Sequence, residues 1–314
     1  MMLTPASSEC TQTFNDRHIH GLAGVDFATS DDLAIRAVLR LLASRRTTQV
    51  TASIPTVELA VLPEILTRLR SVHADGLVDG VHLEGPFLAP EFAGAHPRAA
   101  VLIPNQERGQ RFLATVLDSQ DADQLITMMT LAPELPGFDA IVEQLVAAGI
   151  APALGHTGAT YHQMRHGIAQ VTALTGQPVT ITHLYNAMRG FHHRDPGPIL
   201  AVMEAATRGE VIVEFIADGL HVDLEVIRWW FDQWPDTIRL VSDASAATLP
   251  SGVQPLTAQQ PRLGHIALQY PEAAGPRLAG RATLASGGKD LLVIHDDLVA
   301  AGLDHDLICA AMQR

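Results

Sequence analysis

One pattern recurs eight times along the chain: a short apolar, β-branched run is followed by a stretch in which apolar residues have helical spacing. Such repetition is typical of βα units, whose strands pair in parallel within one sheet. Eight units predict a (β/α)8 barrel of the TIM type, although an open doubly wound sheet can be built from the same units. The runs are Phe14 to His20, Gln49 to Ile54, Leu77 to Leu83, Leu125 to Leu131, Ile150 to Leu154, Val179 to Thr182, Val211 to Ala217 and Ile238 to Val241.

The segments between the runs predict helices and one long connection. The clearest helices are Asp31 to Arg45, Val57 to Val72 and Phe138 to Ala148. The stretch from Leu249 to Arg277 is rich in Pro, Gln and Gly, so we expect an extended loop after the eighth strand. No Gly/Ser-rich linker divides the chain. We therefore expect an N-terminal arm over residues 1–13 and a single barrel domain over residues 14–314.

Composition excludes several classes of protein. The 21 basic and 34 acidic side chains give a formal charge of −13, which disfavours nucleic acid or an anionic membrane as a general partner. Two cysteines, Cys10 and Cys309, are too few for a disulfide framework. No stretch approaches the ~20 apolar residues of a membrane span, and no apolar signal core precedes the first strand. We therefore expect a cytoplasmic protein that binds a small molecule.

Ionisable side chains end nearly every predicted strand. In a (β/α)8 barrel the carboxyl ends of the strands meet at one face, where the active site is built. Ionisable groups gathered there need solvent, a partner or a metal, because burying them alone is costly. The strand ends read His18-Ile19-His20, His82-Leu83-Glu84-Gly85-Pro86, Ala132-Pro133-Glu134, Gly155-His156-Thr157, Thr182-His183-Leu184-Tyr185-Asn186, Asp218-Gly219-Leu220-His221 and Ser242-Asp243-Ala244.

Five of these residues are candidate metal ligands. Glu84, His156 and His183 form a set of one carboxylate and two imidazoles that is common at catalytic zinc and leaves a position for water. His18 and His20 lie on one side of a strand, as two ligands of one metal require. Each residue alone also has a structural explanation, as a hydrogen-bonded core histidine or a solvated loop glutamate. We expect one or two divalent ions per chain, zinc first, with iron, cobalt or manganese also suited to these ligands.

Asp243 is the candidate acid and base. A carboxylate beside the metal can take a proton from water and return it to a leaving group, whereas a helix N-cap is the structural alternative. The single lysine, Lys289, lies beyond the eighth strand, which disfavours a carboxylated lysine as a bridge between two metals. If two metals are present, we expect Glu84 to bridge them.

Nine segments in chain order resemble those of the N-acetylglucosamine-6-phosphate deacetylases, a family of the amidohydrolase superfamily. They are HLEGPF (82–87), GAHP (94–97), LAPELPG (131–137), GHTGATY (155–161), THLYNAM (182–188), HHRDPG (192–197), DGLH (218–221), SDA (242–244) and LAG (278–280). The resemblance extends from His18 to about Met312 and is specific because the segments keep the family order. It implies a hydrolase that removes the N-acetyl group of N-acetylglucosamine 6-phosphate, a linear amide, and releases acetate and glucosamine 6-phosphate.

The resemblance also implies a role for each matched residue. Glu84, His156 and His183 match the ligands of the main metal, His18 and His20 match the pair that can hold a second metal, and Asp243 matches the catalytic acid and base.

The substrate residues follow from the same resemblance. His96 matches the contact to the acetyl carbonyl, where a donor stabilises developing charge. Arg194 matches a phosphate ligand contributed across the interface of a homodimer, and a planar guanidinium suits phosphate. The remaining matches are Asn186 and Ala187 near the phosphate, His221 near the substrate, and Ala95, Leu278, Ala279 and Gly280 in the walls of the sugar pocket.

Two features depart from the family. Its members usually carry a small β-domain, but 17 residues precede His18 and the chain ends at Arg314, so we expect a barrel without this accessory β-sandwich. The first strand is polar at Asn15 and Arg17, so we expect it to differ from a regular barrel strand. Two other functions stay open: deacylation of a different N-acyl amino sugar in a biosynthetic pathway, and a noncatalytic barrel used for binding.

Overall fold

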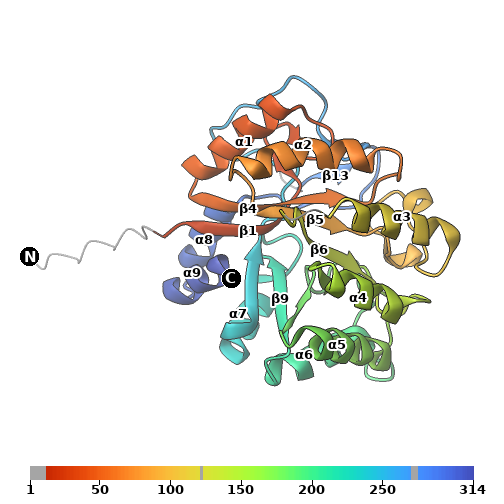
Figure 1. The fold of residues 1–314 in the computed structure, drawn as a ribbon. Helices are drawn as coiled ribbons and strands as arrows, with labels where there is room; N and C mark the ends of the chain where they lie inside the picture. The colour runs from red at the N-terminus through yellow and green to blue at the C-terminus, as the bar shows by residue number, and fades with distance from the viewer. Residues whose placement is uncertain (1–11, 121–122, 270–274) are drawn as a thin grey trace, which may run out of the picture.

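Eight parallel strands form the centre of the molecule in a computed structural model that describes residues 12–120, 123–269 and 275–314 (Figure 1). They are β1 (Phe14–Ile19), β4 (Thr47–Pro55), β5 (Gly80–Glu84), β6 (Ile126–Leu131), β7 (Ala151–Leu154), β8 (Val179–Ile181), β9 (Val211–Ile216) and β10 (Ile238–Val241). Neighbours in the sheet follow the chain order, without the reversal that defines a doubly wound sheet. The backbone N–H of Asp243 donates to the carbonyl of His18 at 2.8 Å, so the last strand meets the first. The predicted (β/α)8 barrel is confirmed, and each predicted run overlaps one of its strands.

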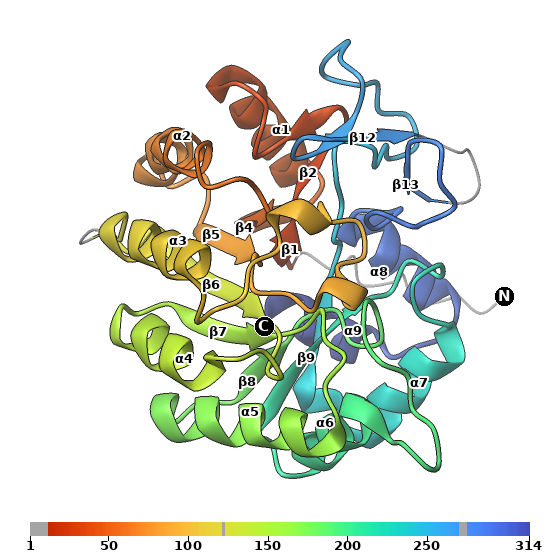
Figure 2. The ribbon, with the colours of Figure 1, turned by 90° about the vertical axis from the view of Figure 1, so that its right-hand side faces the viewer.

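Helices connect the strands and lie around them (Figure 2). They are α1 (Asp32–Ser44), α2 (Leu62–Ala74), α3 (Glu107–Asp118), α4 (Phe138–Ala147), α5 (Tyr161–Thr175), α6 (Gly197–Thr207), α7 (Leu224–Gln233), α8 (Leu291–Ala300) and α9 (His305–Gln313), with 3₁₀ turns η1 (Pro90–Phe92), η2 (Arg98–Ala100) and η3 (Pro235–Thr237). In α1 the buried residues Ile35, Val38 and Leu42 repeat at helical spacing, so one face packs against the strands. No helix in these residue ranges is long and apolar enough to cross a membrane.

One predicted helix begins later than expected. The spacing from Val57 predicted a helical start there, but α2 begins at Leu62, with Pro63 in its first turn. A proline ring collides with the carbonyl four residues earlier and offers no N–H, so a helix cannot run into it from residue 57. The other two predicted helices match α1 and α4 to within a residue.

The first strand is irregular, as its polar sequence predicted. Its pairing with β4 shifts register twice, once after Phe14 and again between Asp16 and Ile19. Asp16 is buried and accepts hydrogen bonds from the backbone N–H groups of Ser242 at 3.2 Å and His18 at 3.4 Å. Burial raises the pKa of Asp16 to about 7 although these hydrogen bonds lower it. Asp16 therefore joins β1 to the end of β10.

The expectation of an extended loop after the eighth strand is wrong in part. The segment from Leu249 to Arg277 contains most of a three-stranded antiparallel sheet, which consists of β11 (Arg262–Leu263), β12 (Ile266–Gln269) and β13 (Arg277–Leu278). Leu263, Leu268 and Leu278 bury one face of this sheet against Ala247. Strands of two to four residues carry too little alternation to be recognised in a Pro-rich stretch.

The described residues form no second β-domain. Outside the barrel and the small sheet, their strands are the hairpin β2 (Gly21–Leu22) and β3 (Val25–Asp26). Most of the predicted arm, residues 1–11, lies outside the described residues. The division into an arm and a single domain stays a prediction.

Candidate active site

The residues predicted as ligands and catalyst lie together at the carboxyl ends of five strands. His18 and His20 end β1, Glu84 ends β5, and the other three follow β7, β8 and β10. They enclose a pocket of about 260 Å³, which His20, Glu84, His156, His183 and Asp243 line. All are buried, so the barrel gathers these ionisable groups in a place where they must be paired or bound to an ion.

Glu84 lies at the centre of the site. One carboxylate oxygen, Oε1, lies 2.9 Å from Nε2 of His156 and 2.9 Å from Nε2 of His183. The other, Oε2, lies 3.1 Å from Nε2 of His20. Burial alone would raise the pKa of Glu84, but the surrounding histidines, first among them His96 and His18, hold it well below its usual range. Glu84 is therefore placed to contact ions at both predicted positions.

In three histidines of the site, Nδ1, the ring nitrogen that faces away from the carboxylates of the pocket, lies near a hydrogen-bond acceptor. Nδ1 of His156 lies 2.8 Å from the carbonyl of Phe92, and Nδ1 of His20 lies 3.1 Å from the carbonyl of Ser53. Nδ1 of His18 lies 3.3 Å from the carboxylate of Glu214. A carbonyl or carboxylate accepts, so a neutral ring carries its proton on Nδ1 and presents the lone pair of Nε2 to Glu84 or Asp243.

This donor set fits a divalent cation. A lone pair that faces a carboxylate oxygen at about 3 Å is stable only when a proton or a metal lies between them. Without a metal the protons remain, and hydrogen bonds to Asp243 and Glu84 overcome the effect of burial and raise the pKa of His20 to about 9. Nε2 of His18 is buried without a hydrogen-bond partner. The clusters able to hold an ion include His18, His20 and Asp243, and His18, Glu84 and His183.

Backbone strain is concentrated at the same place. His156, His183 and Asp243 have φ values of 48°, 28° and 47°, in the left-handed region that non-glycine residues seldom adopt. Each such residue costs about 1–3 kcal/mol, which the surrounding structure must offset. The strain lies where side chains turn from a strand end into the pocket, which is typical of functional sites.

Asp243 faces the two histidines of β1. Its Oδ1 lies 3.3 Å from Nε2 of His20 and 3.5 Å from Nε2 of His18. Burial would raise the pKa of Asp243, but the charges of these two histidines lower it below its usual value. The alternative of a helix N-cap is wrong, because Ala244 next to it pairs with Gly287 as a β-bridge and α8 is capped by Asp290.

Two further histidines line the pocket in fixed orientations. Nδ1 of His96 accepts a hydrogen bond from the backbone N–H of Thr56 at 3.0 Å. Burial lowers the pKa of His96, so the neutral ring carries its proton on Nε2, which lies 3.2 Å from Oε2 of Glu84. His221 lies 2.9 Å from the carboxylate of Asp218 through Nδ1. Burial lowers the pKa of His221, but Asp218 raises it above its usual value overall.

The predicted substrate residues divide into three groups. Ala95, Asn186 and Ala187 line the pocket with His96 and His221. Leu278 is buried behind the pocket wall, in the same apolar cluster that Ala95 contacts. Ala279, Gly280 and Arg194 are exposed and do not line the pocket. Arg194 lies between β8 and α6, in the segment that the resemblance assigns to a dimer interface, so its role stays a prediction.

One wall of the pocket was not predicted from the sequence. Leu263 of β11 lines it, together with Thr283, Leu284 and Ala285, which follow β13. These residues carry no motif, and only the folding of the small sheet brings them to the barrel mouth. Glu134, to which no chemistry was assigned, accepts hydrogen bonds from the Thr157 hydroxyl at 2.5 Å and the Gly158 N–H at 2.6 Å. It therefore holds the turn that follows His156.

Comparison with known proteins identifies relatives of this arrangement. A protein named N-acetylglucosamine-6-phosphate deacetylase from Bos taurus is 36% identical over 245 residues, which cover 74% of this chain and 57% of that protein. One of the same name from Lysinibacillus sphaericus is 32% identical over 276 residues, covering 85% of this chain and 66% of that protein. The chain thus spans less than two thirds of the length of either relative. No family model matches the chain.

A solved structure extends the likeness to the fold. N-acetyl-D-glucosamine-6-phosphate deacetylase from Mycobacterium smegmatis, as a D267A mutant in complex with N-acetyl-D-glucosamine-6-phosphate, superimposes with a TM-score of 0.80 at 33% identity. The match covers 96% of this chain and 74% of that one. Shared sequence, shared barrel and the gathered histidines and carboxylates lead to one conclusion: the chain belongs to the N-acetylglucosamine-6-phosphate deacetylase family.

Proposed function

We propose that this protein is a metal-dependent deacetylase that hydrolyses N-acetylglucosamine 6-phosphate to glucosamine 6-phosphate and acetate. The observation that carries the proposal is the approach of His156 and His183 to one oxygen of Glu84, in a pocket that Asp243 also lines. The names of the relatives and the sugar phosphate bound to the Mycobacterium smegmatis structure support the substrate.

Glu84, His156 and His183 would hold the main metal, because both imidazoles approach one oxygen of Glu84, and His18 and His20, which face the same carboxylate, would hold a second one. Zinc is the first choice for imidazole and carboxylate ligands, with iron, cobalt and manganese as alternatives. When bound, such an ion lowers the pKa of a water molecule and polarises the acetyl carbonyl.

Asp243 moves the proton in the reaction. As a carboxylate, it accepts a proton from the attacking water while the oxygen of that water forms a bond to the acetyl carbon. It then donates the same proton to the sugar nitrogen as the carbon–nitrogen bond breaks, so acetate and the amine leave and the carboxylate is restored. The lowered pKa of Asp243 keeps it ionised, and therefore able to accept the proton, before water attacks the acetyl carbon.

His96 supports the charge that develops on the acetyl oxygen. Because the Thr56 N–H occupies Nδ1, the proton of the neutral ring lies on Nε2, which faces the pocket. A donor held there by the fold stabilises the oxyanion more than the ground-state carbonyl. His221, oriented by Asp218, contacts the substrate from the opposite side of the barrel mouth.

The phosphate would lie near Asn186 and Ala187, at the edge of the pocket. Arg194 is exposed on the described chain, so we propose that it reaches the phosphate in the pocket of a second subunit within a homodimer. A guanidinium suits this role because it forms two parallel hydrogen bonds to phosphate oxygens.

The test is amine release from N-acetylglucosamine 6-phosphate and from N-acetylglucosamine, with metals quantified in the same purified sample. Turnover restricted to the phosphorylated sugar is the expected result. Absence of turnover on both sugars in metal-loaded protein would contradict the proposed substrate and direct the search to other N-acyl amino sugars. Metal-loaded protein that hydrolyses none of these would be a binding protein.

A further inference from the structure

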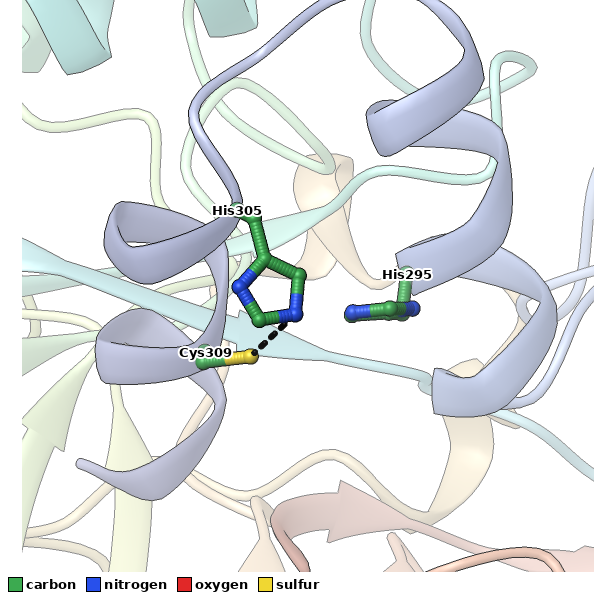
Figure 3. Close-up of side chains that lie close together, drawn as sticks. All are labelled: His295, His305 and Cys309. Atoms are coloured by element: carbon green, nitrogen blue, oxygen red, sulfur yellow. Dashed lines mark hydrogen bonds between the residues drawn. The ribbon is translucent and has the colours of Figure 1, made fainter. Parts of the chain in front are cut away.

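Three metal-ligating side chains that the proposed function does not use meet between α8 and α9 (Figure 3). His295 lies on α8, whereas His305 and Cys309 lie one turn apart on α9. Their ligand atoms all lie within 4.8 Å of one another, and Sγ of Cys309 is 3.6 Å from Nε2 of His305. Figure 3 shows the two imidazoles and the sulfur pointing toward one another.

Both histidines present the same nitrogen to the cluster. Nδ1 of His295 lies 2.9 Å from the carboxylate of Asp296, and Nδ1 of His305 lies 3.1 Å from the carboxylate of Asp306. A carboxylate accepts the proton of Nδ1, so the lone pair of a neutral ring is on Nε2. A carboxylate on the outer nitrogen is the usual arrangement around metal-bound histidines, because it fixes the ring and increases its basicity.

The inner nitrogen of His295 points to a missing ligand. The His295 side chain is only 7% exposed, and its Nε2 has no hydrogen-bond partner among the residues that the structure describes. Leaving a buried polar atom unsatisfied is costly, and an ion bound there removes the cost. His305 is 35% exposed through its side chain, which gives an ion a route from solvent.

We propose that His295, His305 and Cys309 form a second metal site that binds zinc through two Nε2 atoms and Sγ, with water as the fourth ligand. Two imidazoles and a thiolate select zinc over the hard cations magnesium and calcium. On binding, the thiol of Cys309 loses its proton to solvent and the sulfur forms the metal bond.

The site is structural rather than catalytic. The ring of His295 packs against the ring of Phe14, with 5.5 Å between their centroids. Phe14 begins β1 and precedes the proposed ligand His18 by four residues, so Phe14 and His18 lie about 13 Å apart along the strand. A metal there would hold α8 and α9 together beneath the barrel, opposite the mouth where the substrate binds.

Cobalt titration of the full chain tests the proposal. Co²⁺ bound to a thiolate gives an intense charge-transfer absorption in the near ultraviolet, which the imidazole and carboxylate ligands of the catalytic site cannot produce. We expect this absorption in the wild type and its loss in Cys309→Ala and in His305→Ala. Zinc-loaded Cys309→Ala should contain one ion per chain less than the wild type, by mass spectrometry, with unchanged amine release.

Two variants serve as controls. His166→Ala removes an exposed helical histidine that pairs with Asp139, and Cys10→Ser removes the other cysteine of the chain. Both should keep the absorption. The proposal is overturned if the wild type shows no thiolate absorption, if the absorption persists in Cys309→Ala, or if Cys10→Ser abolishes it. If Cys309→Ala does not fold, the partly exposed His305→Ala decides the result.

Discussion

At the scale of single residues, the partner of Nδ1 decides what each histidine of the site can do. In His156 and His20 this nitrogen faces a backbone carbonyl, so Nε2 of a neutral ring has the lone pair that a metal ligand needs. In His96 it accepts from the Thr56 N–H, so Nε2 is a donor. The sequence shows the same residue type in each case. The difference between ligand and donor arises from backbone atoms of other segments.

Asp243→Asn removes the proton acceptor and keeps the size of the side chain. We expect kcat for amine release to fall by about 10²- to 10⁴-fold, because the amide cannot accept a proton from water. Metal content should stay unchanged, since Glu84, His156 and His183 remain. Normal turnover in this variant would remove Asp243 from the mechanism.

Glu214 contacts the site through His18. It is fully buried on β9, lies 3.3 Å from Nδ1 of His18 and 3.4 Å from Nη1 of Arg239. Glu214→Gln removes the charge that orients the ring, so we expect the affinity for the second metal to weaken about 10- to 100-fold. Isothermal titration of metal-free protein measures this change. Glu204→Gln, which alters a carboxylate paired with Tyr161, is the control and should bind metal normally; equal affinities in all three proteins would exclude the role of Glu214.

At the scale of elements, the ends of the strands are positioned by the segments that follow them. Gly287 pairs with Ala244, and its N–H donates to the carbonyl of Asp243 at 2.6 Å. A Cβ atom at Gly287 would lie 1.8 Å from the carbonyl oxygen of Ser242. The stretch before α8 therefore fixes the backbone position of Asp243.

Gly287→Ala forces these two segments apart. We expect a loss of unfolding free energy of about 1–3 kcal/mol, as in overpacked cores, together with a lower kcat because Asp243 moves. Thermal unfolding and amine release measure the two effects. Gly190→Ala is the matched control, because a Cβ there meets nothing within 4 Å. If Gly287→Ala behaves like Gly190→Ala, the close packing does not position Asp243.

At the scale of the whole molecule, one predicted substrate contact lies outside the pocket of its own chain. Arg194 is exposed, whereas Asn186 and Ala187 of the same connection line the pocket. The loop between β8 and α6 thus has one end at the site and the other at the surface. This placement is what a residue needs if it acts on a neighbouring subunit.

Arg194→Ala should raise KM for N-acetylglucosamine 6-phosphate more than for the free sugar, because only the former carries the anion. Steady-state kinetics on both substrates give the comparison, and Arg108→Ala, a remote exposed arginine beside Glu58, should change neither. If the proposed homodimer forms, dilution that dissociates it should reproduce the effect of Arg194→Ala in the wild type. Equal changes for both sugars would mean that Arg194 does not contact the phosphate.

The sequence by itself determined the barrel and which ionisable residues meet at its mouth, because apolar β-branched runs and the residue at each strand end are local properties. Even the irregularity of β1 followed from its polar residues. The tertiary structure alone decided the late start of α2, the small sheet that builds a pocket wall and the proton positions of the histidines. Only the tertiary structure shows that His295 lies close to Cys309. These features depend on contacts between residues distant in the chain, which no local pattern records.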